Sequence, residues 1–351
     1  MPSVFETPAV VIDEDIVDRN IRAAQAEFDR LGIALRPHIK THKLIHFARA
    51  QIDAGARGIT CQKTSEAEIF ADAGFDDILI TYNVIGAEKL ARLRRIARRT
   101  RLSVVADNRA VIAGLSDAFA GEPAPLTVLV ECDTGGGRCG VQSPAEAATL
   151  AGVIAASPGL RFGGLMTYPA PASFGRTDAF LAEARALCRA AAGSCDTISS
   201  GGTPSMKQVP AGTVITEYRP GTYIYNDRSL VARGACDLAD CALTVHATVV
   251  SRPTATRAIL DAGSKTLSSD LLGLTGYGLL RDYPEAVVTG LSEEHGTVDV
   301  SACPHPPQVG EVVAIIPNHA CVVTNLFNTV YLTRAGTAPR KVAVDARGLV
   351  L

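Results

Sequence analysis

The sequence predicts an α/β chain in which a (β/α)8 barrel is followed by an antiparallel β domain. Over the first two thirds, short β-branched runs begin roughly every 20–35 residues and alternate with stretches of helical period. Near Gly234 this rhythm stops, and apolar runs separated by turns follow, with few helical stretches. A length of 351 residues allows one large domain or two ordinary ones.

Eight runs are the expected barrel strands. Strands and helices alternating at this spacing are typical of a parallel sheet, and eight units within about 230 residues favour a barrel over an open sheet. Helices are expected between the runs, for example at 14–31 and 145–156, with Asp13 and Thr64 as N-caps. The expected strands are 9–13, 35–40, 58–62, 77–82, 102–107, 126–133, 162–168 and 197–201.

The remaining runs predict the β domain. We expect the barrel to occupy residues 8–234, and the β domain to occupy 235–351 together with 1–7. Barrel enzymes carry their sites at the C-terminal ends of the strands, so a site is expected where those ends meet the second domain. The expected strands of this domain are 243–250, 258–261, 290–300, 312–317, 329–333 and 342–346.

Composition excludes several classes of protein. Hydrophobic residues make up 47% and charged residues 20%, which argues against disorder. Lys and Arg number 34 against 36 Asp and Glu, a net charge of −2, which argues against a general nucleic-acid binder. The basic stretch at 92–99 has helical spacing and is expected to form a solvated helix face.

Targeting signals and disulfides are not expected. No run approaches 18 apolar residues, and the N-terminal residues lack the pattern of a signal peptide. The nine cysteines are scattered and form no Cys-x-x-Cys motif, which argues against a disulfide framework or a thiolate zinc site. We expect buried thiols in a reducing cytoplasm.

Lys40 is a candidate for covalent chemistry. It ends an expected barrel strand in the basic segment 36–43, where side chains point toward the usual active-site face. A partly desolvated lysine beside other cationic groups can have a lowered pKa and form a Schiff base. The alternative is a surface loop rich in basic residues.

Two glycine-rich loops follow expected strands. The segment 199–204, with Gly201, Gly202 and Thr203, allows backbone N–H groups to approach a phosphate, and its alternative is an ordinary tight turn. The segment 135–140 lacks a convincing dinucleotide-binding pattern, so no such site is predicted. Its Arg138 is a candidate partner for an anion or a ring nitrogen, or a plain loop arginine.

His319 and Cys321 are candidate metal ligands. In extended chain the residues i and i+2 share one face, and a histidine with a thiolate suits Zn²⁺. Two ligands would leave positions for water or substrate, as in catalytic sites. The alternative is a structural histidine beside a buried cysteine. The turn 293–296, with Glu293 and Glu294, could support such a metal or be a solvated acidic turn.

These motifs together resemble one enzyme family. The chain resembles the D-threonine aldolase and D-serine dehydratase family, which comprises fold-type III pyridoxal-phosphate enzymes related to alanine racemase. The likeness runs from about residue 7 to the C-terminus and agrees with the predicted architecture. The matching segments are Thr7-Pro8, 36–43, 61–66, 136–140, 201–203, 261–265, 293–296 and 317–321.

The resemblance implies the cofactors and their residues. Lys40 would bind pyridoxal 5'-phosphate covalently, and a divalent metal would lie at His319 and Cys321. Tyr168 falls where the family has a tyrosine beside the cofactor ring, and Arg138 where it has an arginine near the ring. The other residues assigned to the cofactor are His38, Gly201, Gly202, Thr203, Tyr223 and Asn226.

Two departures from the family pattern bear on the reaction. D-threonine aldolases usually carry His-x-Asp at the metal, whereas the dehydratase branch carries His-x-Cys, as this chain does. Thiolate favours Zn²⁺ over Mn²⁺ or Mg²⁺. Aldolases also have a base histidine soon after the seventh strand, and the segment 168–174 contains none. Lys40, a metal-bound hydroxide or a residue of a second subunit would then take the proton.

The resemblance predicts a lyase acting on D-3-hydroxy amino acids. The first hypothesis is retro-aldol cleavage to glycine and an aldehyde. The second is dehydration to a keto acid and ammonia, favoured by Cys321. Weaker alternatives are an amino-acid racemase and a non-catalytic pyridoxal-phosphate protein. The expected partners are a small D-amino acid and a second copy of the chain in a homodimer, with no nucleic acid and no membrane.

Overall fold

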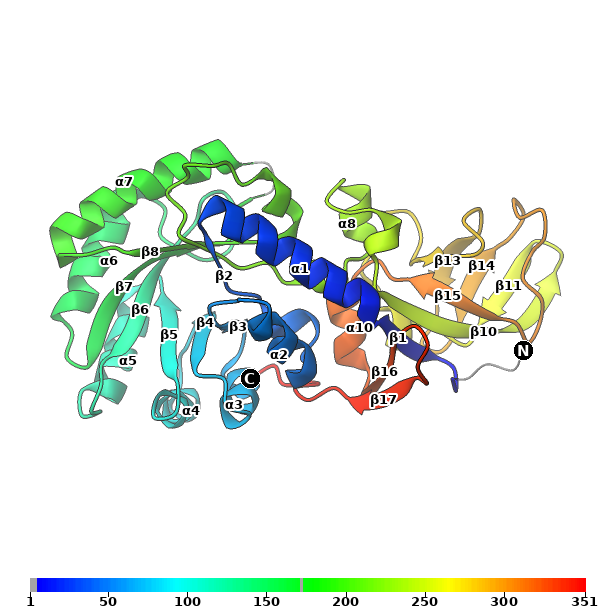
Figure 1. Ribbon diagram of the computed structural model, residues 1–351, viewed down its shortest axis with the longest axis horizontal. Coiled ribbons are helices and arrows are strands. Elements are labelled where there is room, and N and C mark those ends of the chain that lie inside the picture. Colours follow the sequence, from blue (N-terminus) through cyan, green and yellow to red (C-terminus); the bar gives the residue numbers. More distant parts are fainter. Residues whose placement is uncertain (1–4, 171–172) are drawn as a thin grey trace. The chain divides into compact units, whose positions relative to one another are not determined.

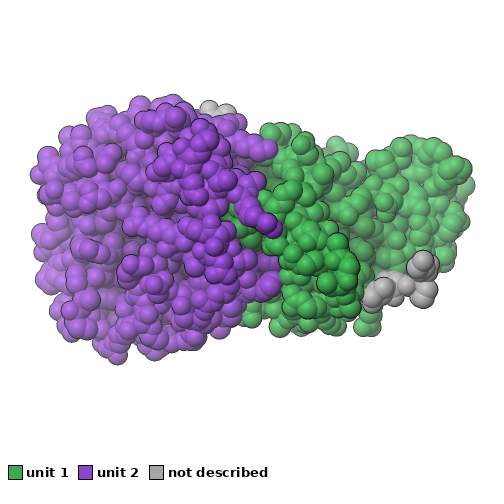
Figure 2. Space-filling model, viewed as in Figure 1, with its two compact units in different colours: residues 1–21, 41–44, 222–348 green, residues 22–40, 45–221, 349–351 purple. Residues whose placement is uncertain are grey.

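The computed structural model describes residues 5–170 and 173–351. Two compact units make up the chain, and they are coloured separately in Figure 2. Unit 1 comprises residues 1–21, 41–44 and 222–348, and unit 2 comprises 22–40, 45–221 and 349–351. The predicted domain limits, 8–234 and 235–351, follow the order of the chain and stay a prediction.

Unit 2 contains the barrel. Its strands are β2 (Ala34–Leu35), β3 (Ile59–Cys61), β4 (Asp77–Asn83), β5 (Arg101–Ala106), β6 (Leu126–Cys132), β7 (Leu160–Thr167), β8 (Thr197–Ser200) and β9 (Glu217–Tyr218). They form one parallel sheet in the order β2-β9-β8-β7-β6-β5-β4-β3. A parallel bridge between His38, after β2, and Thr60 of β3 links the two ends of this order. The predicted (β/α)8 architecture is confirmed.

Helices follow the strands and cover the outer face of the sheet, as Figure 1 shows for α4 to α7. The predicted helix at 14–31 is confirmed as α1. Inside the sheet, Leu79, Val105, Leu129 and Met166 form a buried apolar cluster with one residue from each of four neighbouring strands. The helices are α1 (Glu14–Leu31), α2 (Ile45–Asp53), α3 (Thr64–Asp72), α4 (Ala87–Ala97), α5 (Arg109–Phe119), α6 (Pro144–Ala156) and α7 (Phe174–Ala192).

The basic stretch 92–99 lies mainly on α4 and is a solvated face, as predicted. Its arginines pair with acidic side chains of neighbouring segments: Arg92 and Arg95 with Glu68, and Arg94 and Arg98 with Glu122. The prediction that Thr64 is an N-cap was wrong by one position. Lys63 occupies the cap of α3 in extended conformation, and Thr64 begins the helix.

Two assignments within the barrel were wrong. The run 9–13 forms β1 (Ala9–Asp13), which pairs with strands of unit 1 and is not a barrel strand. The barrel strand that replaces it, β9, has two residues and is too short to show a period of two. The run 35–40 was also predicted as a strand, but the strand ends at Leu35 and only a single bridge at His38 follows it. Lys40 therefore lies in a 3-10 turn, Ile39–Thr41.

Unit 1 is built on a nine-stranded sheet. Its pairs are antiparallel, as predicted, except that β1 and β16 run parallel. The run predicted as one strand at 290–300 is a hairpin of β13 and β14. The strands after β1 are β10 (Leu243–Thr254), β11 (Arg257–Leu260), β12 (Leu279–Leu280), β13 (Val287–Leu291), β14 (Gly296–Asp299), β15 (Val312–Ile316), β16 (Thr329–Thr333) and β17 (Arg340–Ala343). The helices are α8 (Arg228–Ala232), α9 (Ser264–Leu267) and α10 (Ala320–Leu326).

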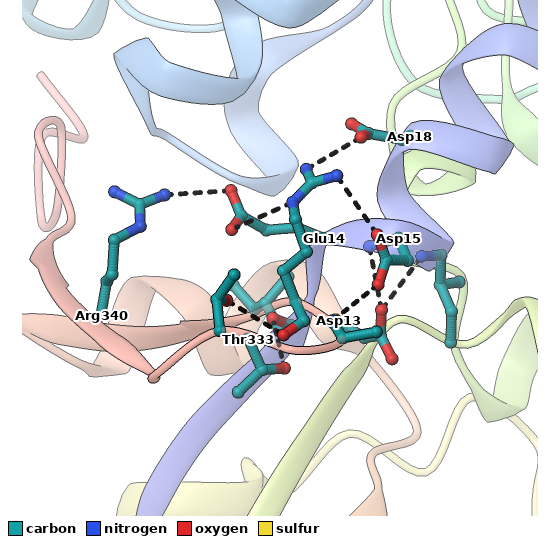
Figure 3. Close-up of polar contacts among 11 residues, drawn as sticks. Asp13, Glu14, Asp15, Asp18, Thr333 and Arg340 are labelled. Atoms are coloured by element: carbon teal, nitrogen blue, oxygen red, sulfur yellow. Dashed lines mark hydrogen bonds and ion pairs between the residues drawn. The ribbon is translucent and has the colours of Figure 1, made fainter.

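Polar contacts hold β1 and the start of α1 to β16 and β17 (Figure 3). The Asp13 carboxylate accepts hydrogen bonds from two backbone N–H groups in the first turn of α1, at 2.9 and 3.1 Å. The prediction that Asp13 is the N-cap of this helix is therefore confirmed. The Thr333 hydroxyl donates to the Ile12 carbonyl at 3.2 Å, and Arg340 pairs with Glu14 at 3.1 Å. These contacts place β1 in the sheet of unit 1.

Most of the cysteines are buried, as the sequence predicts. Among the described residues, which include all nine cysteines, no disulfide is formed, and seven of the thiols are buried. Among the residues that the structure describes, no helix combines the length and the apolar character needed to cross a membrane.

Candidate active site: a cofactor cradle and a metal-ligand pair

The candidate cofactor residues of unit 2 follow the C-terminal ends of the barrel strands. Arg138 lies in the loop after β6, Tyr168 directly follows β7, and Gly201 directly follows β8. Because the strands are parallel, these positions lie at the same end of the barrel, which is where barrel enzymes carry their sites. Lys40 follows β2, the neighbour of β9, at the same end.

The segment before Lys40 is held by the barrel. The His38 backbone N–H donates to the Pro220 carbonyl at 2.9 Å, and the His38 Nε2 lies 3.1 Å from the Gln62 Oε1. The Lys40 backbone N–H donates to the His38 Nδ1 at 3.4 Å. His38 therefore fixes the turn that carries Lys40, and the assignment of both residues to the cofactor stays a prediction.

Arg138 and Tyr168 meet beside the glycine pair. The Arg138 guanidinium lies over the Tyr168 ring, 5.1 Å from its centre. A Cβ placed on Gly202 would lie 3.4 Å from the Tyr168 Cε2. The structure thus brings together three residues that are 30 or more positions apart in the sequence and that were assigned to the cofactor.

The loop after β8 fits a phosphate. A Cβ on Gly201 would lie 2.7 Å from the Arg219 carbonyl oxygen, and Gly202 has a φ of +120°, so both positions require glycine. The Ser200 hydroxyl, directly before this pair, is buried and has no hydrogen-bond partner among the described residues. A buried donor of this kind calls for a ligand that accepts from it. The residues therefore fit the phosphate of pyridoxal phosphate.

Two buried charges near this loop were missed by sequence reasoning. Arg219 donates to the Ser199 hydroxyl at 2.8 Å and to the Thr167 carbonyl at 2.5 Å, and burial lowers its pKa to about 10. Glu131, at the end of β6, lies 3.9 Å from Arg138, and burial raises its pKa to about 7. Glu131 lies within β6 and Arg219 directly follows β9. A single charged residue in or beside a strand forms no recognisable sequence motif.

The predicted metal ligands His319 and Cys321 lie in unit 1, in a local structure that differs from the prediction. His319 caps α10 and Cys321 is the second residue of that helix, so the chain is not extended through them. The two side chains nevertheless interact, because His319 lowers the pKa of Cys321. The helix start is fixed by the buried Asp227, whose carboxylate accepts from the Ala320 N–H at 3.1 Å. A nitrogen and a sulfur donor held together suit Zn²⁺.

Hydroxyl groups and a carboxylate surround this pair. The Thr41 hydroxyl lies 3.1 Å and the Thr222 hydroxyl 3.5 Å from the Cys321 sulfur. The His319 Nδ1 lies 2.7 Å from the Asp270 carboxylate. Asp270 was missed because it is 49 positions away in a loop without a motif. Within the described residues, no group of three His, Cys, Asp or Glu side chains forms a metal site, so the pair offers two protein donors.

The pKa values of His319 and Cys321 are shifted in opposite directions. Burial lowers the pKa of His319, but the hydrogen bond to Cys321 and the Asp270 carboxylate outweigh it and raise this pKa to about 9. Burial raises the pKa of Cys321, but the hydrogen bond from His319 outweighs it, so the pKa is lowered. A thiolate is the form of cysteine that binds metals.

The other predicted residues have varied environments. Tyr223 and Asn226 lie in unit 1, both buried, and the Asn226 amide donates to the Asp240 carbonyl at 3.2 Å. Their assignment to the cofactor stays a prediction. Glu293 and Glu294 are exposed and pair with Lys265 at 2.6 and 2.8 Å. Among the described residues, it is Asp270 that contacts the His319 ring, at 2.7 Å.

Comparison with known proteins identifies the family. The model of the alanine racemase N-terminal domain matches residues 12–229, and that of a putative serine dehydratase domain matches 242–333. A D-threonine aldolase of Arthrobacter sp. is 37% identical over 98% of this chain and 93% of its own. This chain belongs to the D-threonine aldolase and D-serine dehydratase family.

Solved structures of the family share the whole fold. The D-threonine aldolase of Filomicrobium marinum superposes with a TM-score of 0.89 at 32% identity, covering 99% of this chain and 97% of its own. A D-threo-3-hydroxyaspartate dehydratase, solved as a cysteine-to-alanine mutant in a metal-free form, has a TM-score of 0.85 at 31% identity and covers 96% and 97%. The family consists of fold-type III pyridoxal-phosphate enzymes, which supports pyridoxal phosphate as the cofactor of this chain, and the assignment of individual residues to it stays a prediction.

Proposed function

We propose that this protein is a pyridoxal-phosphate- and metal-dependent lyase that cleaves D-3-hydroxy amino acids between Cα and Cβ into glycine and an aldehyde. The observation that carries the proposal is the likeness to a D-threonine aldolase over almost the whole chain. The glycine loop with its buried serine hydroxyl and the His319–Cys321 pair support the two groups that this reaction uses.

The residues of the chain take separate roles in this proposal. Bound pyridoxal phosphate supplies an electron sink for the bond broken at Cα, and a divalent metal supplies positive charge at the β-hydroxyl. Lys40 holds the cofactor through its amine and, once substrate displaces it, can carry a proton at Cα. Arg138 and Tyr168 orient the ring. His319 and Cys321 hold the metal, and the Cys321 thiolate favours Zn²⁺ over Mn²⁺ or Mg²⁺.

A second candidate is dehydration to a keto acid and ammonia. Cys321 favours it, because the dehydratase branch carries His-x-Cys at the metal. The absence of a histidine from the segment 168–174 also weighs against the aldolase. In the dehydratase, Lys40 would take the proton from Cα. Pro171 and Ala172 of this segment lie outside the described residues. A homodimer and a cytoplasmic location remain predictions.

One experiment separates the two reactions. Purified protein is incubated with pyridoxal phosphate, with Zn²⁺, Mn²⁺ or Mg²⁺, and with a panel of D- and L-3-hydroxy amino acids, and glycine and ammonia are measured in the same tubes. We expect glycine with an equimolar aldehyde, from D-isomers alone and most rapidly with Zn²⁺. Ammonia with a keto acid would establish the dehydratase instead. Neither product from any D-isomer would overturn the proposed function.

A further inference from the structure

The His319 ring is fixed by a carboxylate that sequence reasoning did not find. Its Nδ1 lies 2.7 Å from the Asp270 Oδ2, a short distance for a hydrogen bond between an imidazole and a carboxylate. With Nδ1 occupied by this contact, Nε2 is the ring nitrogen that can offer a lone pair to a metal. Because the Asp270 side chain is 43% exposed, water can solvate its charge, and a neighbouring cation is not required to stabilise it.

The loop that carries Asp270 is fastened at several points. The buried Asn318, next to His319 in the chain, donates through Nδ2 to the carbonyls of Asp270 at 3.1 Å and Gly276 at 2.8 Å. The Asp270 N–H donates to the Ser268 hydroxyl at 3.1 Å. Arg228 donates to the Asn318 Oδ1 at 3.1 Å and to the Gly276 carbonyl at 3.2 Å. Asn318 therefore holds the loop while the adjacent His319 receives its carboxylate.

The backbone of this loop is held in an unusual conformation. Ser268 and Leu272 have φ angles of 63° and 50°, in the left-handed region that non-glycine residues rarely adopt. Such conformations cost free energy and persist where surrounding contacts impose them. Both residues lie within two positions of Asp270, so the contacts that impose these conformations also restrict the backbone around Asp270.

We infer that Asp270 is the positioning residue for the metal ligand His319. It accepts the Nδ1 proton, selects the tautomer with the lone pair on Nε2, and fixes the direction of that lone pair, while Asn318 keeps the loop in register. A carboxylate behind a metal-binding histidine typically increases metal affinity by about 10- to 100-fold. The inference rests on the proposed function in that it takes His319 to bind a metal.

Metal affinity tests the inference without an activity assay. Zn²⁺ binding to the pyridoxal-phosphate-loaded protein is measured by competition with a chromophoric chelator for wild type, Asp270→Asn, Asp270→Ala, His319→Ala and, as a matched control, Asp282→Asn on the surface of unit 1. We expect roughly 10- to 100-fold weaker binding by Asp270→Ala and a smaller loss by the near-isosteric Asp270→Asn, which retains an acceptor oxygen. His319→Ala should bind most weakly, and Asp282→Asn should match wild type.

The outcomes distinguish the inference from the proposed function. Wild-type affinity in both Asp270 variants, with loss of binding in His319→Ala, would overturn the positioning role and leave the lyase proposal intact. A wild-type protein that binds no Zn²⁺, Mn²⁺ or Mg²⁺ would overturn the metal-dependent function and the inference with it. The absorbance of the bound cofactor reports folding, and we expect it to be unchanged in Asp270→Asn and Asp270→Ala.

Discussion

At the scale of single residues, Glu131 carries a carboxyl group into the interior of unit 2, where burial opposes its ionisation. The pKa rises to about 7, because burial outweighs the attraction of Arg138 and Arg219. Below its ordinary pKa of 4.5 the group is protonated in the folded and unfolded states alike. As the pH rises toward 7 the unfolded state loses the proton first, so the folded state loses stability across this window.

Replacing Glu131 with glutamine removes this pH dependence. Between about pH 5 and about pH 8 the free energy of unfolding of the wild-type apoprotein should fall by about 2–3 kcal/mol more than that of Glu131→Gln. The measurement is urea unfolding at both pH values. The control is Glu88→Gln, which alters an exposed residue of α4 and should follow wild type. Equal pH dependence in Glu131→Gln and wild type would show that this carboxyl is not the source.

Residue chemistry could be predicted where a motif placed the groups close in the chain. His319 and Cys321 were predicted as a pair, and they meet, although through a helix start and not an extended strand. Asp270 could not be predicted, because the fold alone brings a loop 49 positions away against the histidine. Glu131 was missed because it sits inside an apolar strand.

At the scale of elements, the two shortest barrel strands depend on a buried ionic network. Arg36, directly after β2, contacts Asp77 of β4 at 2.6 Å and Glu217 of β9 at 2.7 Å. Glu217 also accepts from the Ser199 hydroxyl of β8 at 2.6 Å. All four side chains are buried or nearly so. Arg36 opens the basic motif of the cofactor lysine, yet its contacts show a structural role.

Removing the charge of Arg36 should destabilise the barrel. Arg36→Met leaves the Glu217 carboxylate buried without its cation, so we expect the free energy of unfolding to fall by about 3–5 kcal/mol. Arg101→Met is the matched control, since Arg101 also pairs with Asp77, at 3.5 Å, but its side chain is 73% exposed. That control should cost less than about 1 kcal/mol. Similar urea midpoints for the two variants would refute a stabilising role for the network.

The alternation of strands and helices predicted the barrel, but not which run belonged to it. β1 is a β-branched run followed by a helix, like the barrel strands, and only its partners β10 and β16 assign it to the other sheet. The true eighth strand, β9, has two residues and no pattern. Strand partners are a tertiary property that local periodicity does not encode.

At the scale of the whole molecule, each unit contributes one kind of chemistry. In the proposed function, unit 2 supplies the glycine loop, Arg138, Tyr168 and Lys40 to the cofactor, and unit 1 supplies His319 and Cys321 to the metal. The family fold accounts for this order of units along the chain. If both groups act in the reaction, loss of either Lys40 or His319 abolishes turnover.

Glycine release by variants of each contribution tests this requirement most directly. Initial rates on a D-3-hydroxy amino acid are measured, with pyridoxal phosphate and Zn²⁺ present, for wild type, Lys40→Ala, His319→Ala and the surface control Lys89→Ala on α4. We expect Lys89→Ala to match wild type, and Lys40→Ala and His319→Ala each to lose roughly a thousand-fold or more. Full activity in Lys40→Ala, or in His319→Ala after chelation, would contradict the account.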